Sequence, residues 1–236
     1  AALLRFLEQA GIPVAAYREV GTLQELTAAA ALGYPERPII VKPCVARGGR
    51  GALLVDKRTE ILHELFADRA PWRIRLEELA ASWGGAADRP ALLVMEYLPG
   101  DAYDVDVLSR GGAISCLGIR KRYNKRRIPF TGCMTETNEA VQHKVEAAVA
   151  ALRLDFASDV DLAVSEQGEP HILEINPRLS GSIAGAIHAG VNFPLELVRM
   201  ALELPVERRE CAPGIETMPY LLAQSRSVSE VAAHGR

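Results

Sequence analysis

Apolar residues recur along the chain with two spacings, one typical of amphipathic helices and one typical of buried strands. Residues 1–10 place four large apolar side chains on one side of a predicted helix, which Gly11 and Pro13 end. Thr22 is placed as the N-cap of a second helix over residues 23–33. Further helices are predicted over 58–83 with the strongest signal at 58–67, from Thr135 or Thr137 to residue 152, at 183–189 and at 194–203.

Short apolar runs bounded by turn residues predict the strands. These runs lie at 39–42, 52–55, 91–96, 105–108, 114–119, 159–164 and 171–175. The first two are expected to form a hairpin around a glycine-rich loop, 105–108 and 114–119 a second hairpin, and the last two a third. A basic loop is expected over 120–127 and irregular structure over the last thirty residues. Hairpins mixed with flanking helices predict an α+β fold in two lobes.

Charge and cysteine usage narrow the class of protein. A net charge of −3 over 236 residues gives no indication of a nucleic-acid-binding surface. No apolar run reaches the roughly 20 residues that a membrane-spanning helix needs. The four cysteines are scattered without a pairing pattern, which indicates a reducing compartment and a cytoplasmic protein. The five histidines are dispersed and no HExxH or GxSxG motif occurs, so neither a zinc site nor a serine hydrolase is predicted.

A glycine-rich loop follows the strand that carries Lys42. Its glycines Gly48, Gly49 and Gly51 let backbone N–H groups approach a ligand closely, which suits phosphate oxygens, and Lys42 adds a point charge. The alternative is an ordinary hairpin turn. Because the loop joins two strands and lacks the GK[ST] sequence, a P-loop is not predicted.

Acidic and amide side chains gather on the third predicted hairpin. Asp161 lies on one strand and Glu174 on the other, so the two can face each other. Glu174 and Asn176 are two residues apart on an extended segment and therefore point to the same face. Two carboxylates and an amide oxygen form a site of the kind that Mg²⁺ occupies, and Arg178 follows where it could hold a phosphoryl group. The alternative is a surface hairpin with ordinary salt bridges.

Two further segments carry weaker signals. The strand 91–96 ends in the turn 97–100, which offers backbone groups to the edge of a base. A basic cluster is either an anion-binding surface or a solvated face, and it comprises Arg120, Lys121, Arg122, Lys125, Arg126 and Arg127.

Taken in order, these segments resemble the ATP-grasp superfamily. PIIVKPCVARGGRGALLV is similar to its lysine strand and glycine-rich loop, LLVMEYLPGDAYDVDVL to the linker that holds adenine, and HILEINPRLSGS to its metal-binding signature. The match runs from residue 1 to residue 205 and is closest in style to the carbamoyl-phosphate synthetase large chain, biotin carboxylase and related amino-acid ligases. It implies two α+β lobes with antiparallel sheets that grip ATP between them. The lobes are expected at 1–95 and 96–205, with an extension at 206–236.

The resemblance also implies roles for individual residues. Lys42 with Gly48, Gly49 and Gly51 would hold the phosphates, and Glu96, Tyr97 and Leu98 would contact adenine. Asp161, Glu174 and Asn176 would bind Mg²⁺ or Mn²⁺, and Arg178 with Arg120 or Arg122 would stabilise the γ-phosphoryl group and an acyl phosphate.

Three departures from the family pattern are visible. A phosphate-binding lysine or arginine falls one position before Ala1, and the preceding N-terminal lobe is missing, which indicates a fragment of a larger ligase. Ala102 stands where relatives often place a ribose-binding acid. Gly181 stands where carbamoyl-phosphate synthetases carry a second arginine, which counts against a carbamate-forming enzyme.

The expected function is an ATP-dependent ligase that joins a small carboxylate to an amine through an acyl phosphate. One alternative is a bicarbonate-using enzyme of the carbamoyl-phosphate synthetase or biotin carboxylase type. The other is a non-catalytic ATP-binding module. The expected partners are ATP, the carboxylate and the amine, with a homodimer left open.

Overall fold

The structure is a computed structural model that describes residues 1–45, 51–57, 73–86, 88–123 and 132–219. The helices are α1 (Ala2–Gln9), α2 (Leu23–Ala30), α4 (Leu76–Gly84), α5 (Glu139–Leu152), α6 (Ala184–His188) and α7 (Phe193–Ala201). The strands are β1 (Tyr17–Val20), β2 (Ile39–Pro43), β3 (Leu53–Val55), β4 (Arg73–Ile74), β5 (Leu92–Glu96), β6 (Ala102–Arg110), β7 (Ala113–Arg122), β8 (Cys133–Thr135), β9 (Phe156–Val164), β10 (Pro170–Asn176), β11 (Arg209–Glu210) and β12 (Glu216–Thr217).

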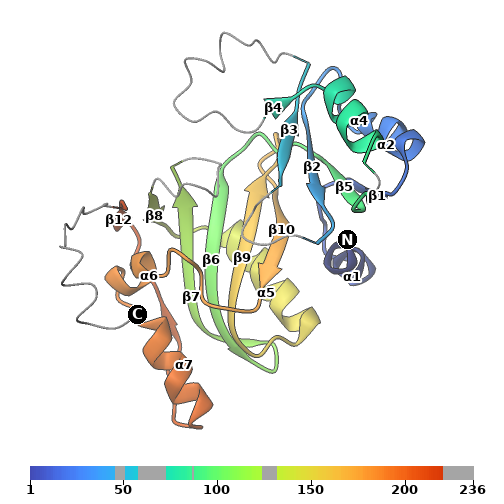
Figure 1. Ribbon diagram of the computed structural model, residues 1–236. Coiled ribbons are helices and arrows are strands. Elements are labelled where there is room, and N and C mark those ends of the chain that lie inside the picture. Colours follow the sequence, from blue (N-terminus) through green and yellow to red (C-terminus); the bar gives the residue numbers. More distant parts are fainter. Residues whose placement is uncertain (46–50, 58–72, 87, 124–131, 220–236) are drawn as a thin grey trace, which may run out of the picture.

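The strands form two sheets, one on each side of the linker 97–101 (Figure 1). The small sheet has the order β1-β5-β2-β3-β4, and the large sheet has the order β10-β9-β6-β7-β8-β12, with β11 beside β7. The three predicted hairpins, β2–β3, β6–β7 and β9–β10, are all antiparallel. The prediction of an α+β fold with antiparallel sheets in two lobes is confirmed.

The small sheet is covered on one face by α2 and α4. Leu26 of α2 and Leu79 of α4 pack against Val41 and Val94 of the sheet. The start of α2 is fixed locally: Thr22 Oγ1 accepts a hydrogen bond from the backbone of Glu25, whose carboxylate accepts one from the backbone of Thr22. The N-cap that the sequence predicted at Thr22 is therefore confirmed.

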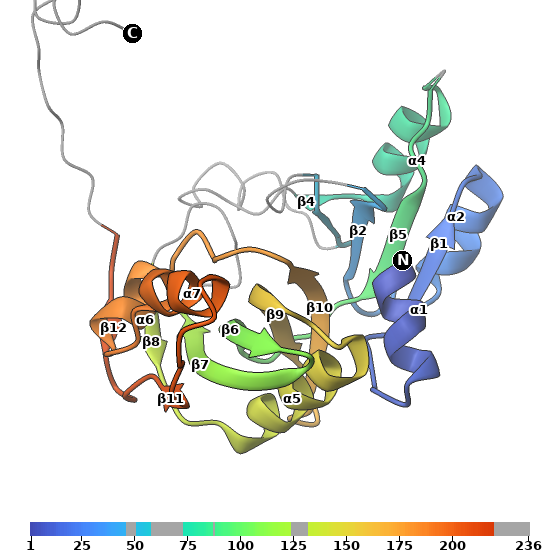
Figure 2. The ribbon, with the colours of Figure 1, turned by 90° about the horizontal axis from the view of Figure 1, so that it is seen from below.

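Different helices cover the two faces of the large sheet (Figure 2). The helix α5 packs on one face, where Val141 and Val145 meet Val105 of β6 and Val160 of β9. On the opposite face, α6 and α7 cover one end, since Phe193 packs with Leu108 of β6. The other end of that face meets the small sheet.

A small apolar cluster joins the two sheets. It contains Leu93 and Met95 of β5, Leu98 of the linker and Ala163 of β9, with Leu4 of α1 beside them. Between this interlobe cluster and the core under α6 and α7 lies a part of the large sheet that none of the described helices covers.

Several predicted elements differ from the observed ones. Residues 73–74 form a strand instead of continuing a helix, and 120–122 belong to β7 instead of a loop. The long helix begins at Glu139, with Asn138 as its N-cap, because residues 133–135 pair with β7. In the segment expected to be irregular, β11 and β12 pair with the large sheet.

The strongest part of the helical prediction, at 58–67, lies outside the described residues, as does most of the basic loop. Within the part of the chain that the structure describes, none of the helices has both the length and the apolar character needed to cross a lipid bilayer.

Candidate functional site

The part of the large sheet between the interlobe cluster and the core under α6 and α7 carries buried acidic side chains at two levels. Side chains alternate between the faces of a strand, so Asp104 and Asp106 of β6 share a face, as do Asp159 and Asp161 of β9. The register pairs Asp104 with Asp161 and Asp106 with Asp159. The four carboxylates therefore form two rows, separated along the strands by about 6.6 Å.

The strand β10 extends both rows. Glu174 is the register partner of Asp161, and Asn176 is the register partner of Asp159. We call Asp104, Asp161 and Glu174 the proximal row, because it is nearer the linker 97–101. We call Asp106, Asp159 and Asn176 the distal row.

A β-bulge puts the β10 side chains on this face. The register shifts between Ile172 and Glu174, so two steps along β10 match one step along β9. Ile172 and Ile175 both pack into the core under α5, although they are three residues apart. Without the extra residue, Glu174 would fall opposite Val160 and point into that core.

The linker lies against one end of the large sheet, and the two rows follow in order from that end. The backbone N–H of Gly100 donates to the carbonyl of Val164 at 2.8 Å, and the Val164 N–H donates to the carbonyl of Asp101. Along β9, starting at this contact, the side chains on the acidic face are Ala163 of the interlobe cluster, then Asp161 and then Asp159. The order from the linker is an apolar patch, the proximal row and the distal row.

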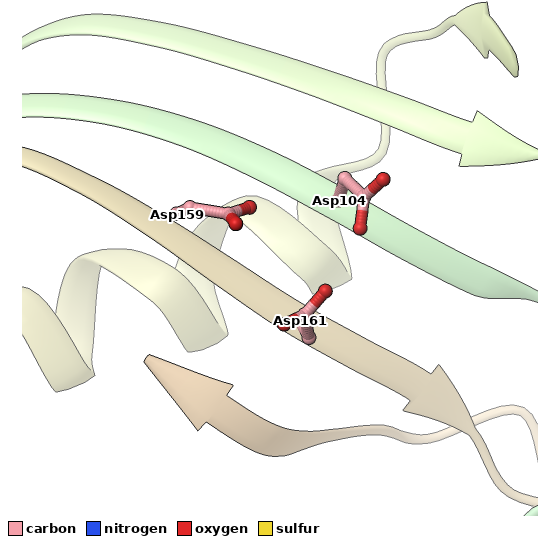
Figure 3. Close-up of side chains that lie close together, drawn as sticks. All are labelled: Asp104, Asp159 and Asp161. Carbon is pink, nitrogen blue, oxygen red and sulfur yellow. The ribbon is translucent and has the colours of Figure 1, made fainter. Parts of the chain in front are cut away.

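Arg122 lies over the proximal row. Its guanidinium binds Asp104 in a short ion pair and lies 3.3 Å from Asp161 Oδ1. The amide of Asn176 donates to Asp161 Oδ2 at 3.4 Å. The carboxylates of Asp104, Asp159 and Asp161 gather between β6 and β9 (Figure 3), with one oxygen of each within 4.8 Å of the others.

Two more arginines bind the distal row. The side chain of Arg178 is 49% exposed, and its Nη1 atom is 2.9 Å from Oδ2 of Asp159. Arg120 is fully buried and holds Asp106 at 2.6 Å, and it also donates to the hydroxyls of Ser180 and Ser182. Arg120 therefore ties the segment after β10 to the sheet.

Burial changes the acidity of the distal row. Desolvation raises the pKa of Asp159, and the nearby charges of Asp104 and Asp106 raise it further, while Arg178 opposes the shift. Burial also raises the pKa of Asp106 against the opposing charge of Arg120. Among the described residues, Oδ1 of Asp106 and Oδ1 of Asp159 are buried and have no hydrogen-bond partner.

The residues of the proximal row fit a hard divalent cation. The row has three carboxylates, and Arg122 contacts two of them. Carboxylate and amide oxygens are the ligands that Mg²⁺ takes, with water and phosphate completing its shell. The donor set of Asp161, Glu174 and Asn176 therefore suits Mg²⁺ or Mn²⁺ once Arg122 releases Asp161.

Lys42 lies on the side of the small sheet that faces these rows. Its register partner is Leu93, and Ile40, two residues earlier on the same face, packs against the interlobe cluster. Ala163 of that cluster lies on the same face of β9 as Asp161. Lys42 and the acidic rows are thus on the facing sides of the two lobes.

The remaining predicted nucleotide residues are placed only in part. Gly51 has φ of +81°, a left-handed conformation that favours glycine, whereas 46–50, which include Gly48 and Gly49, lie outside the described residues. Glu96 ends β5, and its carboxylate accepts a hydrogen bond from the backbone of Ala16 at 2.8 Å. Tyr97 and Leu98 belong to the linker, with Leu98 buried in the interlobe cluster.

Sequence reasoning missed Asp104, Asp106 and Asp159. A signal for them was present, because Asp-Val-Asp occurs both at 104–106 and at 159–161. In a strand, acids at alternate positions lie on one face. Two such strands side by side make a shared acidic surface, but the sequence did not give the pairing of β6 with β9.

A model of the family described as "ATP-grasp in the biosynthetic pathway with Ter operon" matches residues 88–220, which is more than half of the chain. The chain is 27% identical over 195 residues to the carbamoyl phosphate synthase large chain of Thermomicrobium roseum, covering 76% of this chain and 16% of that protein.

Solved structures share the fold. An L-amino acid ligase from Bacillus licheniformis aligns with a TM-score of 0.59 at 20% identity, covering 87% of this chain and 47% of the ligase. A second structure is the biotin carboxylase domain of Hydrogenobacter thermophilus 2-oxoglutarate carboxylase, in complex with MgADP, ADP and bicarbonate. It aligns with a TM-score of 0.66 at 18% identity, covering 88% of this chain and 46% of that one. The chain thus spans less than half the length of each of these proteins. The predicted resemblance is confirmed: this chain belongs to the ATP-grasp family.

Proposed function

We propose that the protein carrying this chain is an ATP-dependent ligase that activates a small carboxylate as an acyl phosphate and couples it to an amine. The observation that carries the proposal is the pair of acidic rows on the sheet face opposite Lys42. An L-amino acid ligase of similar fold supports it.

Two anions must meet in the first step. The oxygen of the substrate carboxylate attacks the γ-phosphorus of ATP, the bond to the β,γ-bridging oxygen breaks, and ADP leaves. The amine nitrogen then attacks the acyl carbon with its lone pair, inorganic phosphate leaves, and the nitrogen loses one proton as the amide forms. Positioning and charge stabilisation supply most of the rate in such transfers.

Cations from both lobes would bind the phosphates. Lys42, with the backbone of Gly48, Gly49 and Gly51, would hold the phosphates from the small lobe, and Glu96, Tyr97 and Leu98 would contact adenine. A divalent ion held by Asp161, Glu174 and Asn176 would neutralise charge on the phosphate oxygens.

The three arginines would have different roles. Arg178 is half exposed and could turn from Asp159 toward the γ-phosphoryl group. Arg122 could turn from Asp161 toward the same group. Arg120 is fully buried, so we assign it the positioning of Ser180 and Ser182 instead of contact with substrate.

A bicarbonate-using enzyme is the second candidate. The likeness to a carbamoyl phosphate synthase large chain favours it, as does the similar fold of a biotin carboxylase domain in complex with bicarbonate. ATP hydrolysis that depends on bicarbonate and needs no added amino acid would support this reaction over the first. Tight ATP binding without ADP release across a panel of acids and amines would support a non-catalytic module. A cytoplasmic location and a homodimer stay predictions.

The test is Glu174→Gln in the full-length protein. Loss of this carboxylate should misplace the divalent ion and lower ADP release by on the order of 100-fold, since even outer partners of metal ligands can cost that much. The matched control is Glu166→Gln, the same substitution at an exposed turn position, which should leave turnover unchanged. Near-normal ADP release by Glu174→Gln would show that the site is assigned wrongly.

A further inference from the structure

The distal row contains two buried carboxylate oxygens that lack a hydrogen-bond donor within the part of the chain that the structure describes. The side chains of Asp106 and Asp159 are only 2% and 6% exposed, and in each the Oδ1 atom has no hydrogen-bond partner among the described residues. The two residues are cross-strand partners on the same face. A buried acceptor left unpaired is costly, so a ligand that brings N–H donors to this row would recover free energy.

The row also has a defined place relative to the proposed nucleotide. Counting from the linker, Ala163 comes first, the proximal row second and the distal row third. A nucleotide that lies with adenine at the linker and its phosphates at the proximal row would direct its γ-phosphate toward the distal row. The group that reacts with the activated acid must approach at that end.

Charge distinguishes the kind of ligand. In the distal row, each carboxylate has an arginine partner, Arg120 for Asp106 and Arg178 for Asp159. The proximal row has three carboxylates, so a divalent ion suits that row. When Arg178 turns to the phosphoryl group, Asp159 loses its counter-charge, and the distal row then suits a monovalent cation with N–H donors.

We propose that Asp159, with Asp106 beside it, binds the protonated amino group of the amine substrate. An ammonium group has three donors and no acceptor, which matches two carboxylate oxygens in need of donors. The exchange is reciprocal: Arg178 leaves Asp159 for the phosphoryl group, and the ammonium takes its place. The ammonium then loses one proton to water, which frees the nitrogen lone pair for attack on the acyl carbon. This inference rests on the proposed ligase function and identifies the residue that selects its second substrate.

The experiment separates activation of the acid from binding of the amine. The full-length protein is given ATP, Mg²⁺ and a carboxylate panel, first with hydroxylamine, a nucleophile that is largely neutral at pH 8, and then with the twenty common amino acids supplied singly. Hydroxamate reports acyl-phosphate formation, and ADP release with each amino acid reports coupling.

Asp159→Asn should raise the KM for the amino acid by on the order of tenfold, because a charge-assisted hydrogen bond becomes a neutral one. Its hydroxamate formation should fall by less than its coupling to the amino acid, since hydroxylamine brings no ammonium charge. Asp106→Asn should have a smaller effect of the same kind. Glu166→Gln, at its exposed turn, should change neither readout.

Each other outcome overturns a different statement. Equal losses of hydroxamate and of coupling would place Asp159 with the phosphates or the metal, and unchanged kinetics in both assays would exclude it from amine binding. A Mn²⁺ titration that finds two ions in wild type and one in Asp159→Asn would replace the ammonium with a second metal. Absence of hydroxamate from wild type with every acid would overturn the ligase function itself.

Discussion

At the scale of single residues, Arg122 pairs with carboxylates that the proposed divalent cation would also need. Its guanidinium pairs with Asp104 and lies 3.3 Å from Asp161, which is a predicted metal ligand. Its Nε atom is buried without a hydrogen-bond partner among the described residues, so the side chain is held chiefly through Nη2. An arginine held in this way can exchange its carboxylates for phosphate oxygens when a divalent ion arrives.

Arg122→Gln should therefore separate metal affinity from turnover. Without the guanidinium, Asp104 and Asp161 keep their negative charge, so Mn²⁺ should bind the nucleotide-free protein more tightly, by on the order of tenfold. ATP turnover should fall, because a cation for the phosphoryl group is lost. Electron paramagnetic resonance of free Mn²⁺ measures the affinity.

The control for this change is Arg208→Gln, whose side chain is 65% exposed at the surface and should leave Mn²⁺ affinity unchanged. Weaker or unaltered Mn²⁺ binding by Arg122→Gln would contradict the competition.

At the scale of elements, Arg120 joins three parts of the large lobe. From β7 it binds Asp106 on β6 and the hydroxyls of Ser180 and Ser182 in the segment between β10 and α6. That segment directly follows Asn176 and Arg178. The buried network therefore holds the site residues after β10 in place against the sheet.

Arg120→Met should be strongly destabilising, by roughly 3–5 kcal/mol, because it leaves the buried carboxylate of Asp106 without its counter-charge. The double variant Arg120→Met with Asp106→Leu should recover most of that loss, since neither charge remains buried. Urea unfolding gives the free energy of unfolding for both variants and for Asp106→Leu alone, which completes the double-mutant cycle. A double variant as unstable as Arg120→Met would show that Ser180 and Ser182, rather than the ion pair, carry the effect.

At the scale of the whole molecule, the linker 97–101 sets how the two lobes meet. Gly100 lies so close to β9 that a Cβ atom would stand 2.6 Å from the carbonyl oxygen of Val164. The next residues lead directly into β6, which carries Asp104 and Asp106. The position of the linker on β9 thus relates the proposed adenine contacts to the acidic rows.

Gly100→Ala should lift the linker from β9. We expect a loss of roughly 1–3 kcal/mol in unfolding free energy from overpacking, together with weaker ATP binding as the small lobe shifts. Thermal unfolding and nucleotide titration measure the two effects. Gly84→Ala is the matched control, because a Cβ there meets only ordinary contacts with Leu23. ATP affinity that survives Gly100→Ala would show that lobe placement does not depend on this contact.

The sequence by itself determined what depends on neighbours along the chain. Alternating and periodic apolar positions predicted the three hairpins, and Thr22 marked the start of α2, because the capping contacts span only three residues. The glycine-rich loop after Lys42 and the Asp161, Glu174, Asn176 and Arg178 set were visible for the same reason. Those local patterns were enough to predict the family, which is confirmed.

Only the tertiary structure decided what depends on pairing between distant strands. The pairing of β6 with β9 brought Asp104 and Asp106 to the site, and β8 includes Thr135, one of the two predicted starts of the long helix. The bulge at Ile172–Glu174 decided which face Glu174 occupies, because one extra residue reverses every later side chain of a strand. Register between strands is set by packing across the whole sheet, so it is not written in either strand alone.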